Sequence, residues 1–118
     1  MTRIALQHLF TIILLVIAGI LEVFGDAKIR QAFDSRRWYP CLLGAASLVI
    51  YGLFVNLAIA LKLINWGFSK QLGFYVAIFA AVSSIYGWGH LNENVGRLHW
   101  FGLSLVIIGG VVIGFSKN

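Results

Sequence analysis

Charged residues divide this chain into four long uncharged runs. Between its nine basic and four acidic residues lie Ile4 to Leu21, Trp38 to Leu61, Gln71 to Asn92 and Leu98 to Ser116. Each run is close in length to the ~20 apolar residues with which an α-helix crosses ~30 Å of hydrocarbon. The pattern predicts an all-α integral membrane protein with a single domain over residues 1–118. Its four transmembrane helices are expected at approximately residues 4–25, 38–61, 69–90 and 98–116.

Composition excludes several other classes of protein. Of the 118 residues, 60% are hydrophobic and 11% are charged, whereas soluble domains carry about 25% charged residues. A water-soluble enzyme and a disordered chain are therefore excluded, and a single cysteine, Cys41, excludes a scaffold held by internal disulfides. The net charge of +5 is spread over predicted loops and termini. We therefore expect the basic residues to anchor the protein in the lipid bilayer, and we expect no nucleic-acid partner.

The distribution of basic residues leaves the orientation in the membrane open. With four spans, one side carries Arg3, Lys62, Lys70 and Lys117, and the other carries Lys28, Arg30, Arg36, Arg37 and Arg97. Topology follows a clear excess of Lys and Arg on one side, and these two sets are almost equal. Either the basic first loop lies inside and fixes one orientation, or copies insert both ways and pair antiparallel.

Glu22, at the end of the first uncharged run, is the strongest functional signal in the chain. A carboxylate within a span is costly unless it is paired, protonated or facing water, so a functional role is the default interpretation. Its helical neighbours three and four positions away are small or acidic: Ala18, Gly19, Gly25 and Asp26. Such a face suits a bundle interior with room for a bound cation that exchanges with a proton. Alternatively, Glu22 reaches the interface or pairs with a basic residue, Lys28 or Arg30.

Five further residues are candidates for the same site. Asp26, one turn beyond Glu22, either completes a two-carboxylate cation site or is solvated at the helix end. Lys70 either ends the second loop or lies inside the third helix, where it would neutralise Glu22. Aromatic rings suited to cation–π contact with a substrate are Phe54, Trp66 and Tyr75.

The remaining motifs indicate packing rather than chemistry. Gly110 and Gly114 form a G-x-x-x-G pattern, a spacing that favours close contact between apolar helices. His8, His90 and His99 lack the spacing of metal ligands. No nucleotide-binding loop or nucleophile motif is present, so we expect no metal site and no enzymatic activity.

Several segments, in the same order along the chain, resemble the small multidrug resistance (SMR) family of drug/metabolite transporters. Leu21 to Gly25 (LEVFG) resembles the family's first-helix motif around its membrane glutamate. The other matching segments are Arg30, Trp38 with Pro40, Phe54 to Ile64, and Gly102 to Gly109, which resembles the dimerisation pattern of the fourth helix.

The resemblance implies a function. A divergent SMR member would be a multi-pass protein of the bacterial inner membrane and an antiparallel homodimer. It would act as an antiporter in which Glu22 is shared between protons and a small cationic substrate, with the proton gradient and no cofactor. The expected dimer interface lies on the fourth helix, at Gly102, Leu105, Val106, Gly109, Gly110 and Gly114.

Two departures from the family pattern keep other functions open. The proline usual after the second helix is Asn65, and the aromatic stretch that opens the third helix is replaced by Phe68 to Leu72 (FSKQL). Because Lys70 in that stretch favours anions, one alternative is a flippase-type subunit for a phosphorylated lipid carrier. Another is a non-transporting accessory subunit that packs through its fourth helix against a larger complex.

Overall fold

The computed structural model describes residues 2–117, and these residues form four α-helices without a strand. The helices are α1 (Arg3–Ser35), α2 (Tyr39–Ala60), α3 (Phe68–Gly89) and α4 (Arg97–Phe115). Each is long and apolar enough to cross a membrane. The prediction of an all-α, four-span membrane protein is therefore confirmed.

The first helix differs most from its expected span. α2, α3 and α4 begin and end within one residue of the predicted limits, whereas α1 continues from the apolar run through the charged segment to Ser35. Within this extension, the Lys28 ammonium donates a hydrogen bond to the Gln31 side chain at 3.3 Å. The helix ends at Arg36, whose φ of 56° places it in the left-handed conformation common at helix C-termini. At 1.5 Å per residue α1 is about 50 Å long, so one crossing does not use its whole length.

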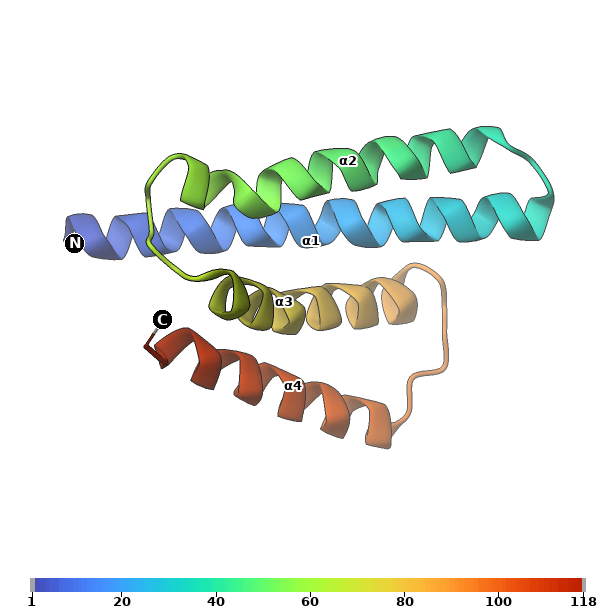
Figure 1. Ribbon diagram of the computed structural model, residues 1–118. Coiled ribbons are helices and arrows are strands. Elements are labelled where there is room, and N and C mark those ends of the chain that lie inside the picture. Colours follow the sequence, from blue (N-terminus) through green and yellow to red (C-terminus); the bar gives the residue numbers. More distant parts are fainter. Residues whose placement is uncertain (1, 118) are drawn as a thin grey trace. The chain divides into compact units, whose positions relative to one another are not determined.

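The four helices group into two compact units, one formed by α1 and α2 and the other by α3 and α4. Figure 1 shows the two antiparallel helices of each unit, joined by a short connection. In both units the helices approach each other through glycine, as is common where helices associate in a membrane.

In the first unit, Gly25 of α1 lies against Gly44 of α2. A Cβ atom at Gly44 would lie 2.5 Å from the Gly25 carbonyl oxygen and 2.6 Å from Cγ1 of Ile29. A Cβ atom at Gly25 would lie 2.9 Å from the Gly44 carbonyl oxygen and 3.0 Å from Cγ of Leu48. These distances leave no room for a side chain at either position, so the two glycines fix how α1 and α2 cross.

In the second unit, Gly110 and Gly114 of α4 face α3. A Cβ atom at Gly110 would clash with the Cβ atom of Ala77, and one at Gly114 would lie 2.9 Å from the ring of Phe74. The G-x-x-x-G pattern of α4 is therefore used inside the chain, where it lets α4 pack closely against α3.

Candidate functional site

The packing of α1 against α2 determines the depth of Glu22. Gly25 lies against Gly44 and Leu48, and the two helices are antiparallel (Figure 1). Residues just before Gly25 on α1 therefore lie beside residues just after Gly44 on α2. α2 runs from Tyr39 to Ala60, so Glu22 lies at the level of the middle of the α2 span, the most apolar depth of the bilayer. Glu22 is half-buried there.

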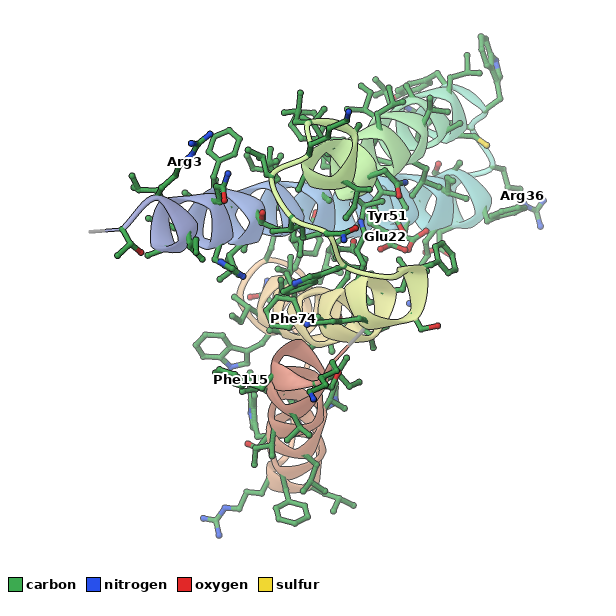
Figure 2. All side chains as sticks on the ribbon, turned by 60° about the vertical axis from the view of Figure 1, so that its left-hand side comes forward. Arg3, Glu22, Arg36, Tyr51, Phe74 and Phe115 are labelled. Atoms are coloured by element: carbon green, nitrogen blue, oxygen red, sulfur yellow. The ribbon has the colours of Figure 1, made fainter. Side chains whose placement is uncertain are left out.

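Tyr51 of α2 lies close to two carboxyl groups of α1. It lies near the middle of α2, is half-buried, and interacts electrostatically with both Glu22 and Asp26. Figure 2 shows the labelled Tyr51 and Glu22 side by side, one from each helix of the unit. The structure thus brings Glu22 and Tyr51 together near mid-span, with Asp26 one helical turn nearer the start of α2.

Sequence reasoning missed Tyr51. The available signal was a tyrosine in the centre of an uncharged run, away from the interfaces where tyrosine is common. A phenol at that depth requires a polar partner. Glu22 is the one carboxyl group within the first two predicted spans, residues 4–25 and 38–61. Which helix faces could meet was not evident from the sequence.

The other candidate residues are distributed over both units. Phe54 is half-buried on α2, three residues after Tyr51 and so on a neighbouring part of the helix surface. Trp66 precedes α3 and makes an edge-to-face contact with Phe74, with ring centroids 5.4 Å apart. Tyr75 is buried on α3. Of the three aromatic candidates, Phe54 therefore shares a unit with Glu22, whereas Trp66 and Tyr75 belong to the second unit.

Lys70 lies inside the first turn of α3, which begins at Phe68. Its ammonium group donates a hydrogen bond of 2.8 Å to the carbonyl oxygen of Ser116, the residue that ends α4. It also lies 4.7 Å from the ring centroid of Trp66. A cation is favoured here because the C-terminal carbonyl groups of a helix carry partial negative charge. Lys70 therefore has a structural role within the second unit, in which it holds the end of α4 against the start of α3.

This contact predicts a stability effect for Lys70→Met. Loss of the hydrogen bond to Ser116 should lower the free energy of unfolding by about 1 kcal/mol, measured by thermal or denaturant unfolding in detergent micelles. Lys117→Met, which removes an exposed lysine one residue beyond Ser116, is the matched control and should have little effect. Equal stabilities of the two variants would show that the Lys70 contact does not contribute.

The six residues expected at a dimer interface fall into two groups. Gly110 and Gly114 contact α3 of the same chain, as described above. The remaining four either have open space beside them or carry exposed side chains: Gly102, Leu105, Val106 and Gly109. The segment that resembles the dimerisation pattern thus lies on the exposed side of α4.

Comparison with known proteins supports a membrane location. The chain is 27% identical to a UPF0060 membrane protein of Synechocystis sp. over 104 residues, which cover 87% of this chain and 91% of the relative. The homologues found for this chain are bacterial UPF0060 membrane proteins. A second one, from Clostridium beijerinckii, is 26% identical over 109 residues, which cover 92% of this chain and 95% of the relative. No protein-family model matches the sequence, and no solved structure matches it significantly.

The UPF0060 relatives match nearly the full length of the chain, so the similarity includes all four helices and the connections between them. Together with the four apolar helices, it establishes a four-span membrane protein with bacterial relatives. The similarity does not extend to an activity, and membership of the SMR family is not shown by it.

Proposed function

We propose that this protein is a proton-coupled antiporter of small organic cations in the bacterial inner membrane, with Glu22 as the group that binds either a proton or the substrate. The observation that carries the proposal is the position of Glu22 beside the middle of α2. An ionisable residue at that depth is expensive to maintain and usually belongs to a proton or substrate pathway.

The chemistry requires one carboxyl group with two mutually exclusive ligands. A carboxylate in a poorly solvated site attracts a cation strongly, because charges interact more strongly at low dielectric constant. Protonation removes that attraction and releases the cation. If the site opens to only one side of the membrane at a time, each exchange moves a proton and a cation in opposite directions.

Mid-membrane depth also favours an antiparallel homodimer. A residue at the centre of the bilayer stays at the centre when a chain is inverted, so two opposite copies place both Glu22 residues at one depth. The nearly balanced basic residues on the two sides of the membrane are consistent with insertion in both orientations. Leu105, Val106 and Gly109, which are exposed on α4, are the candidate contact between the copies.

Tyr51 and Asp26 would adjust the site for its ligand. The Tyr51 hydroxyl group can donate a hydrogen bond to a carboxylate or accept one from a substrate N–H group. Asp26 lies one turn from Glu22, about 6 Å along the helix axis. Its additional negative charge favours substrates with a guanidinium group or more than one amine.

The flippase alternative would need Lys70 to bind a phosphate. Its ammonium group instead donates to Ser116 at the end of α4, so a phosphate would have to displace that contact. The antiporter proposal requires no such rearrangement, because Glu22, Asp26 and Tyr51 already lie together.

Ligand-induced proton release from the purified protein tests the proposal. Guanidinium compounds, quaternary ammonium compounds and polyamines are added near neutral pH in weak buffer, and the released protons are measured. At least one class should release protons from the wild type and none from Glu22→Gln. If the folded wild type releases no protons with any compound of the panel, cation antiport is contradicted. The flippase and accessory functions would then remain.

A second prediction concerns Tyr51→Phe, which removes one hydroxyl group and keeps the ring. Cation affinity should fall about two- to tenfold, as expected for the loss of one polar contact worth about 0.5–1.5 kcal/mol. Binding is measured by calorimetry, and Tyr39→Phe, at the exposed start of α2, is the matched control. Equal affinities of Tyr51→Phe and the control would remove Tyr51 from the site.

A further inference from the structure

A groove lies on the surface of the second unit, between α3 and α4. Its volume is about 510 Å³, within the range of about 300–1,000 Å³ typical of small-molecule sites. The sides of the groove are apolar, with Val76, Phe79 and Ala80 from α3 and Gly102 and Leu103 from α4. Its lining residues do not include Glu22, Asp26 or Tyr51, which belong to the first unit.

One end of the groove is polar. The buried hydroxyl group of Ser84 and Nε2 of His99 are 2.9 Å apart and hydrogen-bonded, and Ser83 lies beside them. His99 is in the first turn of α4, two residues after the exposed Arg97. A neutral imidazole has a donor on one ring nitrogen and an acceptor on the other, so contact with Ser84 leaves His99 able to bind a second group.

The polar end lies at the level expected for lipid head groups. Trp88 near the end of α3 and Trp100 near the start of α4 make an edge-to-face contact, with ring centroids 6.2 Å apart. Tryptophan concentrates at the boundary between hydrocarbon and water. From Ser84 to Val76 the groove then extends eight residues along α3, about 12 Å. That depth lies within one leaflet of a bilayer whose hydrocarbon core is ~30 Å thick.

The residues of α3 that line the groove run from Ser84 to Val76. At this deep end α3 and α4 pack closely, with Ala77 on Gly110 and Phe74 on Gly114. A membrane-spanning helix of a second protein would need a surface that crosses both leaflets. A single acyl chain needs only the apolar trough of one leaflet and a polar group at its mouth.

The charged and titratable residues at this end of the unit are mainly basic, which favours a phosphate group. Arg97 is the fixed positive charge, and the exposed imidazoles of His90 and His99 lie in the same part of the chain. The acidic residue is Glu93, whose carboxylate lies against Gly87 of α3. Basic groups beside an apolar intramembrane groove are typical of sites for phospholipid head groups.

We propose that this groove binds one phospholipid molecule, with an acyl chain along Phe79 and Val76 and the phosphate near His99 and Arg97. The site is independent of cation transport, because it uses no residue of the Glu22 site. It gives the α3–α4 unit a defined lipid partner in one leaflet.

Native mass spectrometry of the full-length protein, delipidated in detergent and titrated with phosphatidylglycerol, tests the site. The wild type should retain one lipid per chain, and Gly102→Leu should bind at least about tenfold more weakly because the side chain fills the groove. The matched control is Gly52→Leu on α2. Among the described residues, neither Gly102 nor Gly52 has an atom close to its Cβ position, but only Gly102 lines the groove, so the control should bind lipid like the wild type.

Diacylglycerol with the same acyl chains tests the phosphate contact, since wild-type protein should prefer phosphatidylglycerol and Arg97→Gln should lose most of that preference. Val76→Trp, at the deep end, provides a second obstruction if Gly102→Leu does not fold. Equal lipid retention by the groove variants and Gly52→Leu would overturn the proposal. So would a wild type that retains no lipid and forms a dimer that Gly102→Leu alone disrupts, because the groove would then be a contact between copies.

Discussion

Replacing Glu22 with glutamine is expected to abolish cation-induced proton release and to reduce cation transport in proteoliposomes to the level of empty vesicles. Glutamine keeps the size and hydrogen-bonding capacity of the side chain but can neither ionise nor release a proton. Because Glu22 lies beside the middle of α2, water cannot substitute for the missing charge. The effect should therefore be a loss of both cation binding and proton coupling.

The control for this experiment is Glu93→Gln. Glu93 is the other glutamate of the chain, exposed in the connection between α3 and α4, and its substitution should leave proton release unchanged. Thermal unfolding of both variants checks that they are folded. Proton release that persists in folded Glu22→Gln would assign the titrating group to another residue, with Asp26 the first to test by Asp26→Asn.

The pH dependence of transport provides an independent measure of the same step. Wild-type antiport should fail at low pH, where protons outcompete the cation for Glu22, and should rise as the pH increases. The residual signal of Glu22→Gln should be flat across the same range. A folded Glu22→Gln variant that retains the wild-type pH profile would separate proton coupling from this carboxyl group.

Gly44→Ala should destabilise the protein by forcing α1 and α2 apart. The new Cβ atom would lie 2.5 Å from the Gly25 carbonyl oxygen and 3.1 Å from the backbone nitrogen of Ile29. Backbone atoms of a packed helix cannot rotate away, so α1 and α2 must separate. Overpacking of this kind costs about 1–3 kcal/mol, and the midpoint of thermal or SDS-induced unfolding, followed by circular dichroism, should fall accordingly.

Gly52→Ala is the matched control in the same helix. Among the described residues, no atom lies within 4 Å of the Cβ position at Gly52 apart from its own helix backbone and chain neighbours. Alanine stabilises a helix interior relative to glycine by up to about 1 kcal/mol. We therefore expect opposite effects from two identical substitutions eight residues apart on α2. If Gly44→Ala unfolds no earlier than Gly52→Ala, the close crossing of α1 and α2 is incorrect, and with it the depth assigned to Glu22.

The Gly44→Ala variant also links the fold to the site. Separation of α1 from α2 should move Tyr51 away from Glu22, so any folded fraction of Gly44→Ala should bind cations more weakly than Gly52→Ala. Wild-type affinity in a destabilised Gly44→Ala variant would show that the site does not depend on the α1–α2 contact.

The sequence by itself determined the helices and the membrane as their surroundings. It also determined that Glu22 is the one acidic residue within the predicted spans. These properties are local, because transfer of about 20 apolar residues into hydrocarbon depends on composition and length alone. The segment into which α1 continues beyond the apolar run has Asp26 and Arg30 four residues apart, a spacing of opposite charges that favours a helix.

Only the tertiary structure decided which groups meet. Tyr51 faces Glu22 because Gly25 and Gly44 set the register of two antiparallel helices, and Lys70 is held by the end of α4 because α3 and α4 pack side by side. The same packing assigned Gly110 and Gly114 to an internal contact and left Gly102 and Gly109 exposed. An apolar helix presents similar hydrophobicity on every side, so its sequence pattern does not identify the face that contacts a neighbour. That choice rests on the shape of small residues at the crossing points, which becomes visible only when the helices are packed.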